Sequence, residues 1–171
     1  MASIHRDKIY LVGFMAAGKT SVARLLADHL HWRAEDIDEL IEARERMTVT
    51  DIFSRFGEPY FRTAEREMLR IVLPLRNTVV ATGGGTFADQ DNRAAIMLDG
   101  LSVWIDVPFA EIVARLPPDG RRPLSGDLAQ LERLYHVRRP AYQQAHVRVD
   151  ASGARVTEVV EQIVDALSRP L

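Results

Sequence analysis

The chain has 171 residues, of which 47% are hydrophobic and 27% are charged, and its formal net charge is −2. This length and composition fit one globular domain with a sizeable core, and the small net charge argues against a nucleic-acid or anionic-membrane partner. Cysteine is absent, which excludes disulfides and thiol chemistry. The apolar runs are too short for a signal peptide or a membrane span, so we expect a cytoplasmic protein.

Hydrophobic patterns predict strands and helices that alternate along the chain. The expected strands are short and rich in apolar or β-branched residues, at 9–12, 32–36, 78–82, 101–107 and 146–149. The expected helices show helical spacing or begin at caps and prolines, at 21–30, 38–47, 50–57, 59–72, 89–98, 108–116, 128–144 and 156–167. Segment 32–36 is more polar than a central strand would be. The alternation predicts an α/β protein, with helices on both faces of a parallel sheet.

A glycine-rich loop follows the first expected strand. Residues 13–20 fit the pattern G-x-x-x-x-G-K-[ST] and lie between a β-rich segment and a helical pattern. The backbone N–H groups and the helix dipole of such a unit form a cradle for anions. Lys19 can reach the outer phosphates of a nucleotide, and the Thr20 hydroxyl can ligate Mg²⁺. A turn that merely needs glycine does not explain this pair, so we expect a nucleotide-phosphate site at Gly13, Ala16, Ala17, Gly18, Lys19, Thr20 and Ser21.

Two more strand ends carry unusual residues, and ligands of such sheets bind outside the carboxyl ends of the strands. Asp36 and Asp38 alternate in an extended segment, so both can point to one side. One acid could orient hydrated Mg²⁺ while the other aligns an acceptor hydroxyl and takes its proton. Alternatively, Asp38 is the N-cap of the next helix and Asp36 is solvated. The triplet Gly83-Gly84-Gly85 cannot pack a core, and it favours close approach of the backbone to a ligand over a flexible connector.

Several arginines lie near these loops in the sequence. Guanidinium groups match carboxylates and phosphates with two parallel hydrogen bonds. With 22 basic residues in the chain, an arginine taken alone is more often a solvated surface group. Position relative to the other motifs singles out Arg62, Arg121, Arg122, Arg138 and Arg139, the last two of which we expect to end a helix before Pro140.

The order of these motifs resembles the shikimate kinase family, over nearly the whole chain. The matching segments are the phosphate loop, Asp36-x-Asp38, Asp51-Ile52-Phe53, Gly57-Glu58-x-x-Phe61-Arg62, Gly83-Gly84-Gly85, Arg122-Pro123-Leu124 and Arg138-x-Pro140-x-Tyr142. The resemblance implies one domain, 1–171, with the three-layer α/β/α fold of P-loop kinases related to nucleoside monophosphate kinases. It implies a five-stranded parallel sheet, a helical substrate-binding region at about 38–70 and a short lid at about 117–127.

The resemblance also implies an activity and a role for each matched residue. A monomeric enzyme would transfer a phosphoryl group from ATP, with Mg²⁺, to the 3-hydroxyl of shikimate in aromatic amino-acid biosynthesis. Lys19 would contact the transferring group, Thr20 would bind Mg²⁺, and Asp36 would orient the water shell of that ion. Asp38 would hold the acceptor hydroxyl and act as the base. Arg62 and Arg138 would contact the carboxylate, and Phe53 and Phe61 would line the ring. Gly84 would contact a hydroxyl through its backbone, within a substrate-binding triplet that includes Gly83 and Gly85. Arg122 would contact the phosphates, and Arg115 would lie by the adenine.

Departures from the family pattern leave nucleotide preference and rate open. They are Ala16 in place of a second loop glycine, a short lid with two prolines, Ser125, Gln144 and a segment 151–154 without basic residues.

Other functions also remain open. A kinase of another small acceptor such as gluconate would lack the clamp formed by Arg62 and Arg138, and a nucleoside monophosphate kinase would accept a nucleotide. A catalytically weak nucleotide switch would have a damaged metal or acceptor site, whereas the expected residues are all present.

Overall fold

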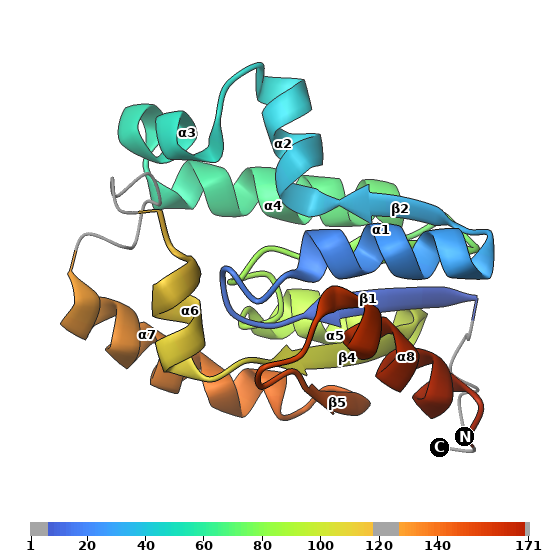
Figure 1. Cartoon of the computed structure of the whole chain (residues 1–171). Coiled ribbons are helices and arrows are strands. Elements are labelled where there is room, and N and C mark those ends of the chain that lie inside the picture. The colour runs from blue at the N-terminus through green and yellow to red at the C-terminus, as the bar shows by residue number, and fades with distance from the viewer. Residues whose placement is uncertain (1–6, 118–126, 170–171) are drawn as a thin grey trace.

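The computed structural model describes residues 7–117 and 127–169. Strands and helices alternate as the sequence predicts (Figure 1). The strands are β1 (Lys8–Val12), β2 (Arg33–Asp36), β3 (Thr78–Ala81), β4 (Leu101–Asp106) and β5 (Val147–Asp150). The helices are α1 (Lys19–Leu30), α2 (Ile37–Glu45), α3 (Val49–Phe56), α4 (Glu58–Val72), α5 (Gln90–Asp99), α6 (Phe109–Arg115), α7 (Leu128–Tyr142) and α8 (Val156–Leu167).

The five strands form one parallel sheet in the order β2-β3-β1-β4-β5, which confirms the expected sheet. Every residue of the three central strands is buried, whereas β2 and β5 are partly exposed. A central parallel strand is covered on both faces and is therefore largely apolar. The polar segment 33–36 suits an edge of the sheet, where the structure places it.

Helices cover both faces of the sheet. The chain passes from β1 to β2 in one direction along the sheet and from β3 to β4 in the other. Right-handed crossovers then place α1 and α5 on opposite faces. Helix α8 packs beside α1, and α5 packs against β4 behind the sheet in Figure 1. This gives the three layers of the expected fold. In the described part of the chain, no helix is long and apolar enough to cross a bilayer.

Helices α2, α3 and α4 pack against one another and form the helical region that follows β2 (Figure 1). The N-cap of α2 is Asp36, whose Oδ1 accepts a hydrogen bond of 3.0 Å from the Glu39 N–H. The sequence-based assignment of Asp38 as the cap is therefore wrong, and Asp38 lies within the first turn. Helix α3 begins one residue earlier than expected because Thr48 caps it, with its hydroxyl accepting from the Asp51 N–H at 3.1 Å.

Helix α7 continues through Pro140, in agreement with the helix expected over 128–144, so the expectation that Arg138 and Arg139 end a helix before this proline is wrong. A proline removes one backbone donor, but near the end of a helix it breaks only a single hydrogen bond. Both arginines therefore project from a regular helix, with Tyr142 as its last residue. Most of the expected lid, including Arg121 and Arg122, lies outside the described residues.

Candidate active site

The carboxyl ends of β1, β2 and β3 meet at one edge of the sheet, because the register pairs Ala81 with both Leu11 and Asp36. The loops that follow these strands enclose a cavity of about 650 Å³. Helices α2 to α4 and α7 complete its wall. Of the residues predicted as site residues, the cavity is lined by Ala16, Ala17, Gly18, Lys19, Thr20, Ser21, Asp36, Asp38, Phe53, Phe61, Arg62, Gly83, Gly84, Gly85, Arg115 and Arg138. Two predicted residues are not among them: Arg122 lies outside the described part, and Gly13 lies behind the wall.

The phosphate loop is tightly packed on the sheet. A Cβ on Gly13 would lie 2.8 Å from the Ile105 carbonyl oxygen of β4, so only glycine allows this approach. The Gly13 carbonyl faces inward and accepts a hydrogen bond of 2.7 Å from Lys19 Nζ, and the Phe14 carbonyl accepts another of 2.8 Å. Gly13 thus shapes the loop and orients Lys19, and does not itself line the cavity.

Helix α1 begins at the loop without a side-chain cap, since its N-cap is Gly18 with a positive φ of 91°. The N–H groups of its first turn point away from the helix body, and together with its dipole they suit an anion. At the outer side of the loop, Arg115 Nη1 donates to the Ala16 carbonyl at 3.2 Å. Ala16 itself has a φ of 58°, a conformation that glycine adopts more readily. The departure from glycine at this position is therefore accommodated by strain in the loop.

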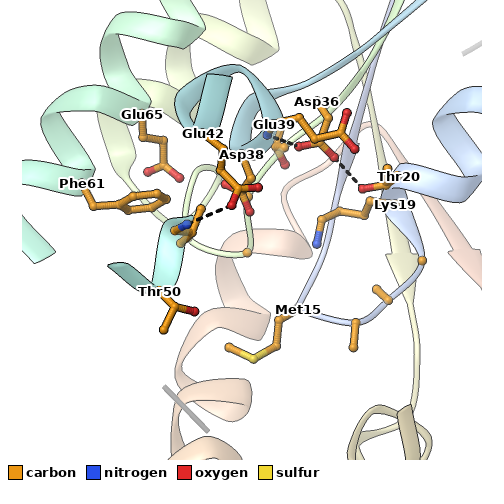
Figure 2. A pocket seen from close by; sticks show the side chains of 18 of the residues that line it. Met15, Lys19, Thr20, Asp36, Asp38, Glu39, Glu42, Thr50, Phe61 and Glu65 are labelled. Carbon is orange, nitrogen blue, oxygen red and sulfur yellow. Dashed lines mark hydrogen bonds between the residues drawn. The ribbon is translucent and has the colours of Figure 1, made fainter. Parts of the chain in front are cut away.

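Thr20 and Asp36 come together from α1 and the end of β2. The Thr20 hydroxyl donates to Asp36 Oδ2 at 2.5 Å (Figure 2). The other oxygen of Asp36 caps α2, a role that the sequence suggested for Asp38 instead. A hydroxyl and a carboxylate side by side at the N-terminus of α1 are hard oxygen donors of the kind that Mg²⁺ prefers.

Asp38 faces the cavity from the first turn of α2. Its Oδ1 atom is buried and has no hydrogen-bond partner among the described residues. Burial, followed by repulsion from Asp36 and Glu65, raises the pKa of Asp38 to about 7, although the charge of Lys19 opposes the shift. A carboxyl group that titrates near neutrality is suited to exchange a proton with a substrate.

Gly83 and Gly85 allow side chains to approach the backbone closely. A Cβ on Gly83 would lie 2.9 Å from both Asp38 Oδ1 and Glu65 Oε2. A Cβ on Gly85 would lie 2.6 Å from Arg62 Nη2. Any larger residue would displace these charged groups. The sequence predicted close approach of a ligand, and the structure shows that the cavity's own acids and arginine already need this space.

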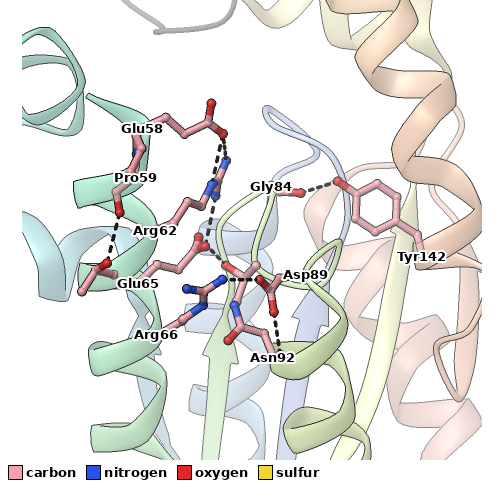
Figure 3. A network of polar contacts seen from close by, with 11 residues as sticks. Glu58, Pro59, Arg62, Glu65, Arg66, Gly84, Asp89, Asn92 and Tyr142 are labelled. Atoms are coloured by element: carbon pink, nitrogen blue, oxygen red, sulfur yellow. Dashed lines mark hydrogen bonds and ion pairs between the residues drawn. The ribbon is translucent and has the colours of Figure 1, made fainter. Parts of the chain in front are cut away.

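Two arginines face the cavity in different electrostatic settings. Arg62 of α4 pairs with Glu65 at 3.0 Å and with Glu58 at 3.2 Å (Figure 3). Arg138 of α7 is only 7% exposed, and its guanidinium lies 5.9 Å from the centre of the Phe14 ring. Burial lowers the pKa of Arg138. Among the described residues no acid forms an ion pair with Arg138, so its charge is left without a carboxylate partner.

An apolar wall faces the charged groups. The rings of Phe53 and Phe61 lie 4.7 Å apart, and both line the cavity. A ligand bound here would meet acids, arginines and aromatic rings together, which fits a small polar molecule with an apolar ring.

The family model described as "Shikimate kinase" matches residues 15–168. The chain belongs to the shikimate kinase family. The shikimate kinase of Sulfurihydrogenibium sp. (strain YO3AOP1) is 37% identical to it over 94% of this chain and 98% of that one. The shikimate kinase of Persephonella marina (strain DSM 14350 / EX-H1) is 38% identical over 91% of this chain and 96% of its own.

Solved structures agree with this membership. The shikimate kinase from Acinetobacter baumannii in complex with shikimate superposes with a TM-score of 0.91, at 32% identity over 95% of this chain and 93% of that chain. The deoxyadenosine kinase from M.mycoides with bound dATP has a TM-score of 0.65 at 16% identity, which shows a shared fold alone. As a member of the shikimate kinase family, the chain is an ATP-dependent kinase.

Sequence reasoning missed several residues that this shikimate kinase fold brings to the site or against its wall, among them Glu65, Glu42 and Tyr142. Glu65 lies one turn after Arg62, and the spacing of an i, i+3 pair on a helix could have indicated it. Glu42 lies one turn after Asp38 and accepts the Val49 N–H at 3.0 Å, which ties α2 to α3. Tyr142 had no assigned role, because nothing in the sequence shows that the end of α7 meets the glycine triplet.

Proposed function

We propose that this chain transfers the γ-phosphoryl group of ATP to the 3-hydroxyl of shikimate, giving shikimate 3-phosphate and ADP. The observation that carries the proposal is the buried Arg138 guanidinium, which lines the cavity and has no acidic partner among the described residues. A buried charge is costly unless an opposite charge compensates it. The carboxylate of a small hydroxy acid would supply that charge, with Arg62 as the second arm of a clamp.

The same cavity offers a fit for the rest of the acceptor. Phe53 and Phe61 would cover an apolar face of the ring. Asp38 would accept a hydrogen bond from the reacting hydroxyl through its unpartnered Oδ1. As the hydroxyl oxygen bonds to the γ-phosphorus, the bond from that phosphorus to the β–γ bridging oxygen breaks. The hydroxyl proton passes to Asp38, and the ADP oxygen leaves as an anion.

The nucleotide would bind at the other end of the cavity. The N–H groups of the phosphate loop and of the first turn of α1 would hold the phosphates. Lys19 would exchange the carbonyls of Gly13 and Phe14 for oxygens of the transferring group and stabilise the charge on it. We assign Arg122, which lies outside the described residues, to the lid that closes over the phosphates. Arg115 would lie by the adenine.

Thr20 and Asp36 fit a magnesium ion, Thr20 directly and Asp36 through water. The described residues contain no group of three or more histidine or acidic residues arranged to hold a metal. This agrees with the usual mode of Mg²⁺, which takes few protein ligands and shares the phosphates of the substrate. When bound, the ion would neutralise charge on the β- and γ-phosphates.

A coupled assay of ADP release tests the proposed acceptor directly. With Mg²⁺ and ATP, we expect turnover with shikimate and at least about a hundredfold lower kcat/KM with gluconate or nucleoside monophosphates, since neither presents the same carboxylate and ring. Faster turnover with gluconate would assign the clamp to another hydroxy acid. ADP release that no acceptor accelerates would instead favour a nucleotide-binding protein.

We further propose that the enzyme acts as a cytoplasmic monomer without nucleic-acid or membrane partners. The absence of cysteine suits a reducing compartment, and the net charge of −2 provides no basic field for nucleic acid. Light scattering during gel filtration should give a mass near the 19.3 kDa of one chain. A mass of twice that value would replace the monomer with a dimer.

A further inference from the structure

Tyr142 connects helix α7 to the glycine triplet. Its ring is 1% exposed and packs with Trp104 at a centroid distance of 6.1 Å. Its hydroxyl donates a hydrogen bond to the carbonyl oxygen of Gly84 (Figure 3). The phenol thus reaches from the last turn of α7 to the backbone of the cavity wall, where burial of the ring fixes the position of its hydroxyl group.

The same hydroxyl lies next to Arg138, one turn earlier on α7. Burial raises the pKa of Tyr142 to about 12, so the guanidinium lies beside a neutral phenol. Arg138 also lies against the triplet, since a Cβ on Gly84 would be 3.3 Å from Arg138 Nη1. Arg138, Tyr142 and the Gly84 carbonyl therefore meet at one point of the wall, where the phenol donates to the carbonyl and the guanidinium lies beside the same glycine.

This contact fixes the orientation of a peptide unit that the cavity needs. The Gly84–Gly85 peptide is planar and trans, so its N–H points away from the carbonyl that Tyr142 holds. Glycine peptides rotate more easily than others, and both residues line the cavity. With the carbonyl turned to Tyr142, the Gly85 N–H is directed away from α7, and the peptide cannot rotate without losing a buried hydrogen bond.

We propose that Tyr142 is a positioning residue for acceptor binding, whose hydroxyl holds the Gly84–Gly85 peptide and the Arg138 guanidinium in one arrangement before the acceptor arrives. The inference rests on the proposed function, because the acceptor is taken to be the carboxylate-bearing shikimate. A preorganised pair of donors binds more tightly, since the cost of ordering them is met during folding. Loss of the hydroxyl should therefore weaken acceptor binding and leave nucleotide binding intact.

Tyr142→Phe removes the hydroxyl and keeps the ring. We expect the KM for shikimate and its dissociation constant, measured by calorimetry, each to rise about tenfold, the effect of one lost buried hydrogen bond. The KM for ATP should stay within about twofold, because the hydrogen bond found for this hydroxyl among the described residues goes to Gly84 and not to the phosphate loop. An unchanged dissociation constant for shikimate, or an equal rise in both KM values, overturns the inference.

Tyr135→Phe is the matched control. Tyr135 lies on the same helix, is also buried, donates to the Val107 carbonyl at 2.9 Å and accepts from Arg139 at 2.8 Å, and neither of these partners lines the cavity. Both variants lose a phenol–carbonyl hydrogen bond, so we expect similar losses in Tm. The control should bind shikimate as the wild type does. Equal loss of shikimate affinity in both variants would mean that Tyr142 acts only through stability.

A double-mutant cycle with Arg138→Lys tests whether Tyr142 acts through the arginine and its peptide. If both belong to one unit, the combined loss of shikimate affinity should be smaller than the product of the two single losses. If the combined loss equals the product of the two single losses, Tyr142 and Arg138 act independently, which would contradict a shared unit. These outcomes are separate from the proposed function. A wild-type enzyme that does not phosphorylate shikimate disproves that function, whereas the outcomes named for Tyr142→Phe, for the control and for the cycle decide the inference on a wild type that is active.

Discussion

The carboxylates of Asp38 and Glu65 converge on Gly83, each 2.9 Å from the position that a Cβ on this residue would occupy. Glu65 is held by Arg62 at 3.0 Å and by the Thr86 hydroxyl at 2.8 Å. Asp38 has no comparable partner at Oδ1 among the described residues. Burial and repulsion from the neighbouring acids therefore disfavour the charged form of Asp38, and the pKa of this carboxyl rises to about 7.

The pH dependence of the reaction should report this carboxyl. Asp38 accepts a proton only when it is ionised, and protonation becomes dominant below its pKa of about 7. In the free enzyme, kcat/KM for shikimate should therefore fall about tenfold for each pH unit below that value. A pH–rate profile from acid to mildly alkaline pH checks this. A profile that stays flat well below neutrality would remove Asp38 from the role of base.

Asp38→Asn should separate catalysis from nucleotide binding. The amide cannot accept the proton, so we expect kcat to fall by about 10²- to 10⁴-fold. The dissociation constant of ATP, measured by calorimetry, should change little because the phosphate loop is untouched. A large loss of ATP affinity instead would move Asp38 to the metal site.

The same variant should be more stable than the wild type at alkaline pH. The pKa of Asp38 is about 7 in the folded protein and near 3.9 when unfolded, so its contribution to stability is fully present below about pH 4 and is lost as the pH rises through 7. The amide in the Asp38→Asn variant would carry no charge at any pH. We expect the Tm of this variant to exceed that of the wild type by several degrees at about pH 8 and to match it near pH 4.

A change on the surface provides the control for this comparison. Asp28→Asn alters an exposed carboxylate on α1 and should not reproduce the pH-dependent gain. If Asp38→Asn lowers Tm equally at both pH values, the carboxyl is not under strain in the folded protein.

The sheet and its helices could be predicted from the sequence because each central strand is largely apolar and each helix has a clear pattern or cap. The polar β2 was expected to differ from a central strand, and it lies at the edge. The helix expected over 128–144 includes Pro140 and is confirmed, whereas the expectation that Arg138 and Arg139 end a helix before this proline was wrong, since sequence alone does not show that a helix tolerates a proline in its last turn. The alternative interpretation, with Asp38 as the cap of α2, was wrong because Asp36 is an equally good cap and takes that position.

The candidate site was predictable where residues follow strands directly, because parallel strands bring their carboxyl ends to one edge. Contacts between distant segments were not. The partners Tyr142 and Gly84 are 58 positions apart, and their meeting depends on the packing of α7 beside the sheet. Glu65 and Glu42 were also missed, since a solvated helix face carries acids as often as a cavity does.

Lys19→Met should cut turnover by about 10³-fold or more, because it removes preorganised positive charge from the transferring group. The assay is the steady-state kcat with saturating ATP and shikimate. The Tm of the variant should be compared with that of the wild type, since Lys19 also bonds the Gly13 and Phe14 carbonyls. A folded variant that retains turnover within about tenfold would contradict the phosphate assignment.

Arg62→Ala should weaken acceptor binding by about 2–5 kcal/mol, the cost of leaving a buried charge partner unpaired. The KM for shikimate and its dissociation constant measure this effect. Arg66→Ala is the control, because Arg66 follows one turn later on α4, is half exposed and pairs with Asp89 at 2.8 Å outside the cavity. Equal behaviour of the two variants would argue against a clamp at Arg62.

The most direct test of the central claim is the position of the phosphoryl group in the product. Purified protein should be incubated with ATP, Mg²⁺ and shikimate, and the product examined by ³¹P–¹H correlation NMR. We predict a signal that links the phosphorus to the proton on C3 of shikimate, which disappears with Lys19→Met. Inorganic phosphate as the only new phosphorus species besides ADP, or a phosphoryl group on a different hydroxyl, would contradict the proposed arrangement of Asp38 and the two arginines.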